Sequence, residues 1–325
     1  MKRPHVILST LSLSVVSLLS LIPARSASAQ GFATAADVAR ADALLKQMTT
    51  EEKIGQLNQP FYLKLPIPGT KTDPVSYEDH VRRGEVGSFL FLTDPKEINR
   101  LQKIAMTEQR LHIPLLFGFD VIHGFDTEFP VPVGVSASWD PEVAERGQAM
   151  AAEEAGHAGL RWTFAPMVDI ARDPRWGRIS EGAGEDPYLG AAMARAQVRG
   201  FQGTPEDPRP FMATLKHFAG YGAAEGGRDY DAAYIPEELL QNVYLAPFRA
   251  GVETGAGTVM SAYMDLNDVP ASGNDHLLQD ILRKELGFNG FVVSDAFAVG
   301  SLVTQGFAKD GTALKSPFNM AWVGV

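Results

Sequence analysis

Phe291-Val292-Val293-Ser294-Asp295 is an apolar run that ends on a carboxylate. Such a run is typical of a buried parallel strand, with Asp295 at its C-terminal edge. Leu115-Leu116-Phe117-Gly118-Phe119-Asp120 has the same pattern, and Thr214-Leu215-Lys216-His217 ends on a cation and an imidazole. Each ionisable group alone also fits a helix N-cap or a salt bridge. In a parallel barrel, however, the C-terminal ends of all strands lie on the face that carries the active site. Several ionisable groups at such strand ends therefore predict one shared site.

Strand-like and helix-like segments alternate from residue 35 almost to the end of the chain, which predicts an α/β fold with a parallel sheet. Asp140-Pro141 and Asp186-Pro187 mark two helix starts. The most economical arrangement is a TIM-like (β/α)8 barrel. An open doubly wound sheet is the alternative, but its glycine-rich phosphate turn is missing. The last strand is weak and no final helix follows it, so the C-terminal end of the barrel is expected to be incomplete. The predicted strands are residues 86–92, 115–120, 131–136, 161–166, 213–218, 258–263, 291–295 and 318–323.

Residues 1–29 are predicted to be a signal peptide. Lys2 and Arg3 precede an apolar stretch, and Ala27-Ser28-Ala29 forms a small-residue cleavage site. A membrane span is the competing interpretation, but a span needs roughly 20 mostly apolar residues, and this stretch is shorter and rich in hydroxyl groups. We therefore expect an exported protein, periplasmic or secreted, with no membrane span after cleavage. Residues 30–325 suffice for one barrel or for two smaller domains.

The charge and the amino-acid composition exclude several classes of binding partner and chemistry. The net charge of −10 falls to about −13 once Lys2, Arg3 and Arg25 leave with the signal peptide, which argues against nucleic acid as a partner. The chain has no cysteine, so disulfides, thiolate nucleophiles and cysteine-ligated zinc are excluded. A neutral or cationic small molecule fits this charge better.

Two regions interrupt the alternating pattern. Residues 167–186 form a long segment without periodicity and carry many charged side chains, among them Asp169, Arg178 and Glu181. Long loops in compact domains tend to be functional, but we assign most of these charges to an ion-pair network that ties the loop to the barrel. The glycine-rich segment 219–234 directly follows Lys216-His217 and is expected to arch over the same site.

The residue types at the strand ends suit a carbohydrate. Asp, Arg and Lys bind sugar hydroxyls, and aromatic rings cover the apolar faces of sugars. Glycoside cleavage needs one carboxylate to attack or stabilise the anomeric carbon and an acid to protonate the leaving oxygen. Asp295, with Tyr263 one strand away, fits the first role if the pKa of its carboxyl stays low. The expected pocket aromatics are Phe119, Trp139, Trp162, Trp176, Tyr221 and Tyr263.

A catalytic metal is the main rival interpretation. Asp120-x-x-His123 with His217 offers a His/carboxylate set. No His-x-His or His-Glu-x-x-His pair occurs, so we expect no metal and no cofactor, with His123 as a loop residue that packs or hydrogen-bonds locally.

Four motifs together resemble family 3 glycoside hydrolases, in particular their periplasmic β-glucosidase branch. The similarity runs from about Ala36 to Val303. The motifs are Gly118-Phe119-Asp120-Val121-Ile122-His123-Gly124, Arg172-Asp173-Pro174-Arg175-Trp176-Gly177-Arg178, Lys216-His217-Phe218 with Gly220-Tyr221-Gly222, and Phe291-Val292-Val293-Ser294-Asp295.

The resemblance implies a retaining β-glucosidase that acts on the non-reducing end of small oligosaccharides or aryl β-glucosides, with Asp295 as the nucleophile. It further implies that Tyr263 lies near the nucleophile and that the sugar hydroxyls are bound by Asp120, Arg178, Lys216 and His217. Lys216 and Arg178 would also help to keep Asp295 ionised.

The chain departs from the family pattern in several places. The resemblance places the acid/base glutamate in a following α/β sandwich domain, which residues 30–325 are expected to lack; a non-hydrolytic sugar-binding remnant is therefore an alternative. A β-xylosidase of the same fold stays open. The β-N-acetylhexosaminidase branch is disfavoured because segment 223–231 holds no histidine. Ala296 replaces a frequent Trp or His, and Asp268 a frequent glycine.

Overall fold

The computed structural model describes residues 34–62, 76–304, 306–308 and 319–321. The predicted signal peptide lies outside these residues. None of the helices in the described ranges has the length and apolar character that a membrane span requires.

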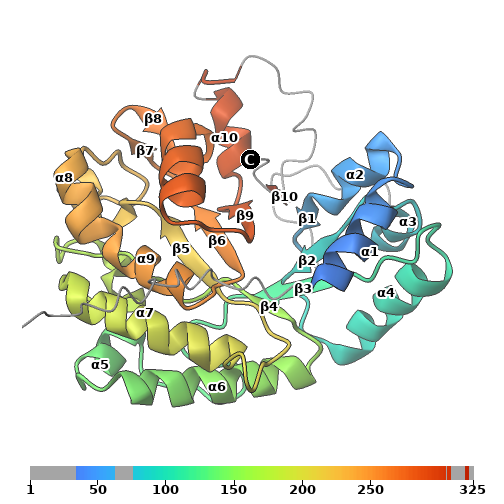
Figure 1. Ribbon diagram of the computed structural model, residues 1–325, viewed down its shortest axis with the longest axis horizontal. Helices are drawn as coiled ribbons and strands as arrows, with labels where there is room; N and C mark the ends of the chain where they lie inside the picture. The colour runs from blue at the N-terminus through green and yellow to red at the C-terminus, as the bar shows by residue number, and fades with distance from the viewer. Residues whose placement is uncertain (1–33, 63–75, 305, 309–318, 322–325) are drawn as a thin grey trace, which may run out of the picture.

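Two three-stranded parallel sheets form the centre of the molecule (Figure 1). The first consists of β2 (Ser88–Leu90), β3 (Leu116–Phe119) and β4 (Trp162–Thr163). The second consists of β5 (Thr214–Phe218), β6 (Thr258–Ser261) and β9 (Phe291–Ser294). Six of the eight predicted strands are thus present as parallel strands, each within its predicted range, and the α/β class with parallel strands is confirmed.

Single parallel bridges join these sheets into a longer series of strands. Trp162 pairs with Met212 and Met167 with Lys216, which places β4 beside β5. At the other end, β1 (Asn58–Pro60) continues to a parallel bridge between Phe61 and Leu90 of β2. The result is barrel-like. It is not a closed barrel, because within the described residues β9 pairs with β6 alone.

Two predicted strands differ from the structure. Residues 131–136 form the short helix α5 (Pro132–Ser136), because Pro132 lacks a ladder N–H and its fixed φ suits a first helical position. The weak strand at 318–323 is present as β10 (Asn319–Ala321), but it runs antiparallel to β1, which the sequence did not reveal. A hairpin of β7 (Asp265–Leu266) and β8 (Val269–Pro270) completes the strands described.

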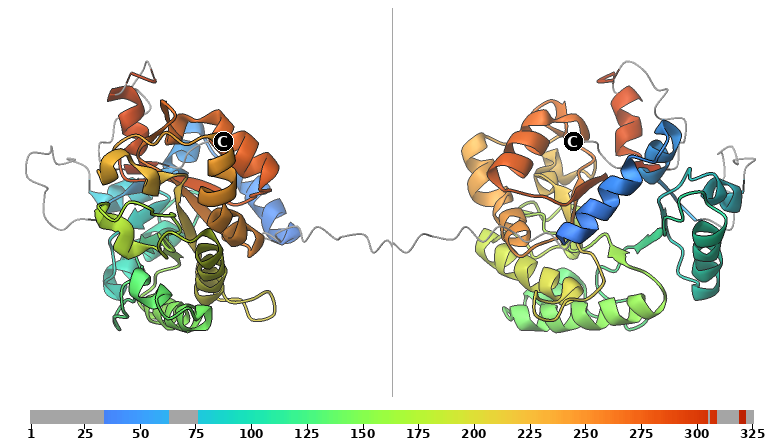
Figure 2. Two further views of the ribbon diagram at one scale, coloured as in Figure 1. Left: turned by 90° about the vertical axis from the view of Figure 1, so that its left-hand side faces the viewer. Right: turned by 45° about the vertical axis from the view of Figure 1, so that its right-hand side comes forward.

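Helices cover the outside of the strands (Figures 1 and 2), and α7 packs against both α6 and α9. The helices are α1 (Ala35–Leu45), α2 (Thr50–Gln56), α3 (Tyr77–Arg82), α4 (Pro95–Thr107), α5, α6 (Pro141–His157), α7 (Pro187–Gln202), α8 (Glu237–Leu239), α9 (Ala246–Glu253) and α10 (Ala298–Thr304). The 3-10 segments are η1 (Gly177–Glu181), η2 (Tyr221–Ala223), η3 (Glu225–Gly227) and η5 (Ala271–Gly273), and the π-helical segments are η4 (Leu240–Tyr244) and η6 (His276–Glu285).

Local signals explain where several helices begin. Thr49 and Glu52 form the predicted capping box at the start of α2. Asp140 and Asp186 accept backbone hydrogen bonds at the starts of α6 and α7, each followed by a proline in the first turn.

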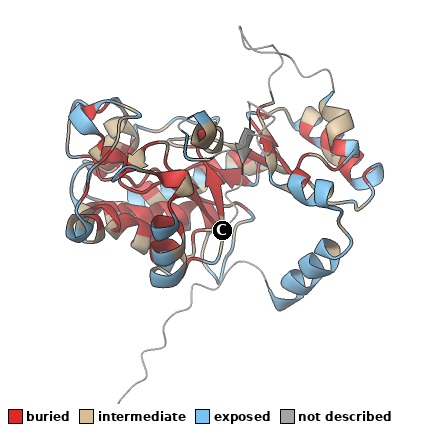
Figure 3. Cartoon of the chain, turned by 90° about the horizontal axis from the view of Figure 1, so that it is seen from above, coloured by how far each residue is buried: buried red, intermediate tan, exposed pale blue. Residues whose placement is uncertain are grey.

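Burial is concentrated on the strands and the inner helix faces, whereas α1 has no buried residue (Figure 3). An inner cluster of Phe61, Leu90, Trp162, Phe164, Met260 and Val293 fills the space between the sheets. The indole N–H of Trp162 lies 2.9 Å from the hydroxyl of Thr214 and 3.1 Å from that of Thr258, so it ties the two sheets together.

Candidate active site

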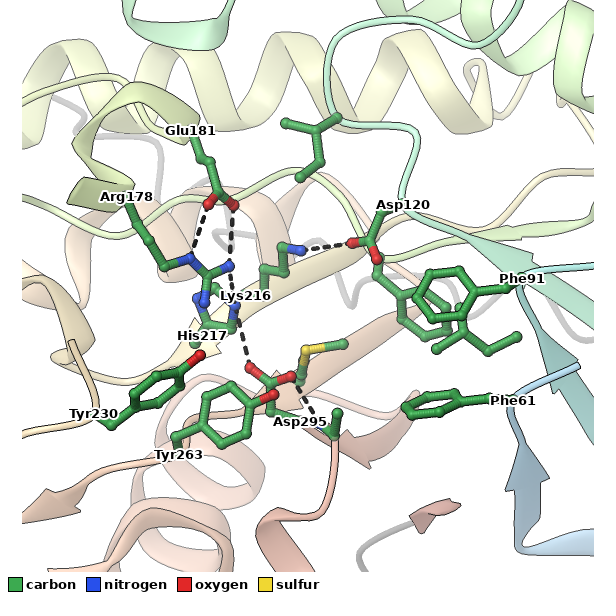
Figure 4. A pocket seen from close by; sticks show the side chains of 15 residues that line it. Phe61, Phe91, Asp120, Arg178, Glu181, Lys216, His217, Tyr230, Tyr263 and Asp295 are labelled. Carbon is green, nitrogen blue, oxygen red and sulfur yellow. Dashed lines mark hydrogen bonds and ion pairs between the residues drawn. The ribbon is translucent and has the colours of Figure 1, made fainter. Parts of the chain in front are cut away.

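A cavity of about 320 Å³, the first cavity, lies at the C-terminal ends of the strands (Figure 4). All six residues that the sequence singled out line it, although they come from segments far apart in the chain: Asp120, Arg178, Lys216, His217, Tyr263 and Asp295. The remaining lining residues are Phe61, Leu90, Phe91, Ile122, Phe164, Glu181, Tyr230, Met260 and Ala296. The cavity therefore combines charged groups with aromatic and aliphatic surface.

Asp295 follows directly after β9. Its Oδ1 accepts a hydrogen bond of 2.7 Å from the backbone N–H of Ala296. Its Oδ2 is buried and has no hydrogen-bond partner among the described residues, although Nε2 of His217 lies 3.3 Å away. Burial raises the pKa of Asp295 to about 6, while the charges of Lys216 and Arg178 act in the opposite direction. The low pKa expected from the sequence is not found, because desolvation of the carboxyl outweighs the charges of the two cations.

Asp120 and Lys216 form an ion pair across the cavity. Nζ of Lys216 lies 2.7 Å from Oδ1 of Asp120, and the lysine side chain is only 5% exposed whereas the aspartate side chain is 36% exposed. The pair joins the end of β3 to β5. The second oxygen of Asp120 makes no hydrogen bond to the described residues, so it is available to a ligand in the cavity.

His217 is held by a buried carboxylate that the sequence did not mark as functional. Oδ2 of Asp169 lies 2.8 Å from Nδ1 of His217 and also accepts the backbone N–H of the same residue at 2.9 Å. Burial, together with the charges of Arg178 and Lys216, lowers the pKa of His217 well below its usual value. The ring is therefore neutral, with its proton on Nδ1 facing Asp169.

Asp169 itself is fully enclosed. Burial raises the pKa of its carboxyl to about 7, against the hydrogen bond from the His217 backbone. In the sequence, Asp169 was one of many charges in a loop, and only its position directly after the apolar run Met167-Val168 could have marked it as another strand-end carboxylate.

Arg178 connects His217 to the long charged loop. Its Nη2 lies 3.1 Å from Nε2 of His217, and two further hydrogen bonds of 2.8 and 3.0 Å reach Glu181. Burial alone would lower the pKa of the guanidinium, but Glu181 and Asp295 together raise it above its usual value. Because Arg178 can only donate, Nε2 of His217 acts as the acceptor, which agrees with the tautomer that Asp169 selects.

Two tyrosines form one wall of the cavity. The rings of Tyr230 and Tyr263 meet edge to face with their centres 5.1 Å apart. Burial and the charge of Asp295 raise the pKa of Tyr263, so its hydroxyl stays protonated and can donate to that carboxylate. Tyr230 comes from segment 219–234, which was expected to arch over the site, and Trp176 anchors the residue before it through a bond of 2.9 Å to Asp229.

Most of the aromatic residues expected in the pocket lie elsewhere. Trp162, Trp176 and Tyr221 are fully buried, Trp139 is 71% exposed, and neither it nor Phe119 lines the first cavity. Of the six, only Tyr263 is a lining residue. The aromatic surface is supplied by Phe61, Phe91, Phe164 and Tyr230, which the sequence did not single out because aromatic residues are equally common in cores.

The three residues of the rival metal site do not all line one cavity, since Asp120 shares the first cavity with His217 and a neighbouring one with His123. His123 lines a neighbouring cavity, where its Nδ1 lies 3.0 Å from the carbonyl oxygen of Phe129. His217 is bound by Asp169 and Arg178 as described above. Within the described ranges no group of three His, Asp or Glu side chains is arranged to hold a metal ion.

Residues 49–322 match the family model of the glycosyl hydrolase family 3 N terminal domain. The chain belongs to glycosyl hydrolase family 3. This confirms the resemblance inferred from the four motifs.

Curated family 3 relatives include two with different named activities. The chain is 41% identical over 268 residues to a periplasmic beta-glucosidase of Salmonella typhimurium, covering 82% of this chain and 34% of that protein. It is 38% identical over 230 residues to a beta-xylosidase of Formosa agariphila, covering 66% of this chain and 32% of that protein. The chain thus spans about a third of the length of these relatives.

Solved family 3 structures share the fold. A beta-glucosidase from Listeria innocua in complex with isofagomine superimposes with a TM-score of 0.77 at 35% identity, covering 85% of this chain and 39% of that chain. The same enzyme is known in complex with glucose, and a mutant of it is known in complex with laminaribiose.

Proposed function

We propose that this chain carries the sugar-binding and nucleophile-bearing part of an exported retaining β-glucosidase. It would release terminal β-D-glucosyl residues from the non-reducing ends of small oligosaccharides or aryl β-glucosides. The observation that carries this proposal is the buried Oδ2 of Asp295, which faces a sugar-sized cavity and is left without a hydrogen bond by the described residues.

The charged and imidazole side chains of the first cavity have roles in the proposed mechanism. Oδ2 of Asp295 attacks the anomeric carbon, the bond to the leaving oxygen breaks, and a covalent glycosyl-enzyme forms, which water then hydrolyses. Lys216 and Arg178 stabilise the ionised carboxylate before attack. Asp120, Lys216, Arg178 and His217 bind the sugar hydroxyls.

A proton donor for the leaving oxygen is not assigned among the described lining residues. The two other carboxylates of the first cavity, Asp120 and Glu181, are paired with Lys216 and Arg178.

Export is proposed on two grounds. Residues 1–29 have the charge, apolar stretch and cleavage site of a signal peptide. The relative from Salmonella typhimurium carries the name of a periplasmic enzyme. We propose that residues 30–325 form the barrel domain of the exported protein.

The decisive experiment uses 2,4-dinitrophenyl β-glucoside, whose leaving group departs without a proton donor. Asp295→Ala should lower the rate of dinitrophenolate release by roughly 10⁴-fold or more, because the nucleophile is removed. Asp280→Ala, on the exposed side of η6, serves as a control that keeps full activity. An Asp295→Ala variant that keeps the activity of the parent refutes the assignment.

A β-xylosidase is the second candidate, and the relative from Formosa agariphila favours it. Asp120 has a free oxygen toward the end of the cavity remote from Asp295, where the 4- and 6-hydroxyls of a hexose would lie. Xylose lacks the 6-hydroxyl, so the proposal expects a higher kcat/KM for the aryl β-glucoside than for the aryl β-xyloside. The reverse preference would favour the xylosidase.

A further inference from the structure

A second cavity of about 270 Å³ lies next to the first. Asp120, Ile122 and Glu181 line both cavities, so the two cavities adjoin at these residues. The other residues of the second cavity are Phe119, His123, Gly124, Phe125, Glu128, Val131, Pro132 and Ser180. Its volume is close to that of the first cavity, so it has room for one more unit of similar size.

The lining of the second cavity mixes apolar surface with groups that bond hydroxyls. Phe119, Phe125 and Val131 supply the apolar part. Nδ1 of His123 donates to the carbonyl oxygen of Phe129, which leaves Nε2 for another polar partner. Ser180 adds a hydroxyl. Aromatic faces combined with scattered acceptors and donors are the surface that a sugar requires.

The charge of this lining favours a neutral ligand. Lys216 neutralises Asp120, and Arg178 neutralises Glu181. Glu128 is the acidic lining residue that has no ion pair within the described part of the chain. A phosphate or carboxylate group in the second cavity would therefore meet net negative charge.

The position of the second cavity fixes which part of the substrate reaches it. In the first cavity the carboxyls of Asp120 and Asp295 lie apart, the former paired with Lys216 and the latter beside Tyr263 (Figure 4). A pyranose whose C1 faces Asp295 points its C4 and its C6 hydroxymethyl group toward the opposite end, where Asp120 lies. The second cavity begins behind Asp120.

We propose that the second cavity binds a neutral glycosyl group carried on O4 or O6 of the glucosyl unit that occupies the first cavity. This inference rests on the proposed function and extends it. The enzyme then accepts glycosides whose non-reducing glucosyl unit is itself substituted, and it releases the substituted unit intact. Asp120 and Ile122 contact the substrate at the junction of the two units.

The test uses 2,4-dinitrophenyl β-isomaltoside and 2,4-dinitrophenyl β-maltoside, in which an α-glucosyl group sits on O6 or O4. The α bond is not a substrate for a β-glucosidase, so dinitrophenolate appears only when the whole disaccharide occupies both cavities. The whole protein should release dinitrophenolate together with isomaltose or maltose from at least one probe. Release from neither probe, with the unsubstituted glucoside still cleaved, overturns the inference.

Two matched tryptophan variants test whether the substituent binds in the second cavity. Val131→Trp fills the second cavity at a residue that is 43% exposed and lies outside the first cavity. It should lower kcat/KM for the accepted probe by about tenfold or more and leave the unsubstituted glucoside unaffected. Val143→Trp, at an exposed valine of α6 away from both cavities, should change neither. Equal rates for Val131→Trp and the parent on the disaccharide probe contradict the inference.

If even the unsubstituted glucoside is not cleaved, the proposed function is refuted, but the second cavity can still be tested by binding. Calorimetric titration with isomaltose and maltose should then give tighter binding than glucose, and Val131→Trp should remove this advantage. Equal affinity for the disaccharides and glucose overturns the inference.

Discussion

At the scale of single residues, catalysis and folding place conflicting requirements on the carboxyl of Asp295. A nucleophile must be ionised, yet this carboxyl is buried and one of its oxygens lacks a hydrogen bond from the described residues. Burial raises the pKa to about 6, and the nearby cations limit the rise. The ionised group is therefore costly to the folded state, which is expected where function and stability conflict.

The cost should appear as a pH-dependent stability difference in Asp295→Asn. The folded pKa of about 6 exceeds the value of 3.8 expected in the unfolded chain, so the stability contributed by this group is present below about pH 3.8 and is lost as pH rises through 6. Asn cannot ionise. The variant should gain about 1–3 kcal/mol in the free energy of unfolding at pH 7.5, and the gain should shrink toward pH 4.

Urea unfolding of parent and variant at both pH values measures this difference. Asp280→Asn is the control, since Lys284 lowers the pKa of that exposed carboxyl and its removal should slightly weaken the fold at pH 7.5. A lower stability of Asp295→Asn at pH 7.5 would contradict the explanation.

Asp169 illustrates what single residues reveal only in context. Its sequence neighbours indicate a charged loop, most of whose charges are assigned from the sequence to an ion-pair network. The structure gives it two bonds to His217, which fix the ring and its tautomer. Burial cannot be read from a loop without periodicity, so this partner was found only in the fold.

At the scale of elements, helix starts were the best-predicted features. Asp186 caps α7 by accepting the backbone N–H of Leu189 at 2.8 Å, and Pro187 follows in the first turn. Such signals are local, since capping satisfies backbone donors within a few residues. Strand direction has no such local signal, because the antiparallel direction of β10 depends on its distant partner β1.

Loss of the α7 cap should be measurable. Asp186→Ala leaves the N–H of Leu189 without its side-chain acceptor and should lower the free energy of unfolding by about 1 kcal/mol. Asp186→Ser retains a capping oxygen and should lose much less. Chemical denaturation compares the three proteins; equal stability of the Ala and Ser variants would rule out capping as the cause.

At the scale of the whole molecule, the joint between the two parallel sheets is the feature that holds the site together. Asp120 follows a strand of the first sheet, whereas Lys216 and His217 lie in the second sheet and Asp295 directly follows its strand β9. Trp162 crosses this joint with bonds to Thr214 and Thr258. The ion pair of Asp120 with Lys216 therefore depends on how the sheets are placed relative to each other.

Trp162→Phe should weaken this joint. The smaller ring leaves a void and removes the indole N–H that both threonine hydroxyls share, so the free energy of unfolding should fall by about 2–3 kcal/mol. Trp139→Phe, at a position that is 71% exposed, should have a free energy of unfolding within about 0.5 kcal/mol of that of the parent. Guanidinium unfolding followed by circular dichroism distinguishes the two, and equal effects would contradict a special role for Trp162.

The sequence by itself determined the α/β class, six of the parallel strands and the polar residues at their ends, because hydrophobic runs, turn residues and caps act over a few positions. Only the tertiary structure decided that β10 runs antiparallel, that Asp169 holds His217, and which aromatic rings face the first cavity. These features depend on contacts between segments far apart in the chain. Their free energy comes from burial and pairing that no local pattern records.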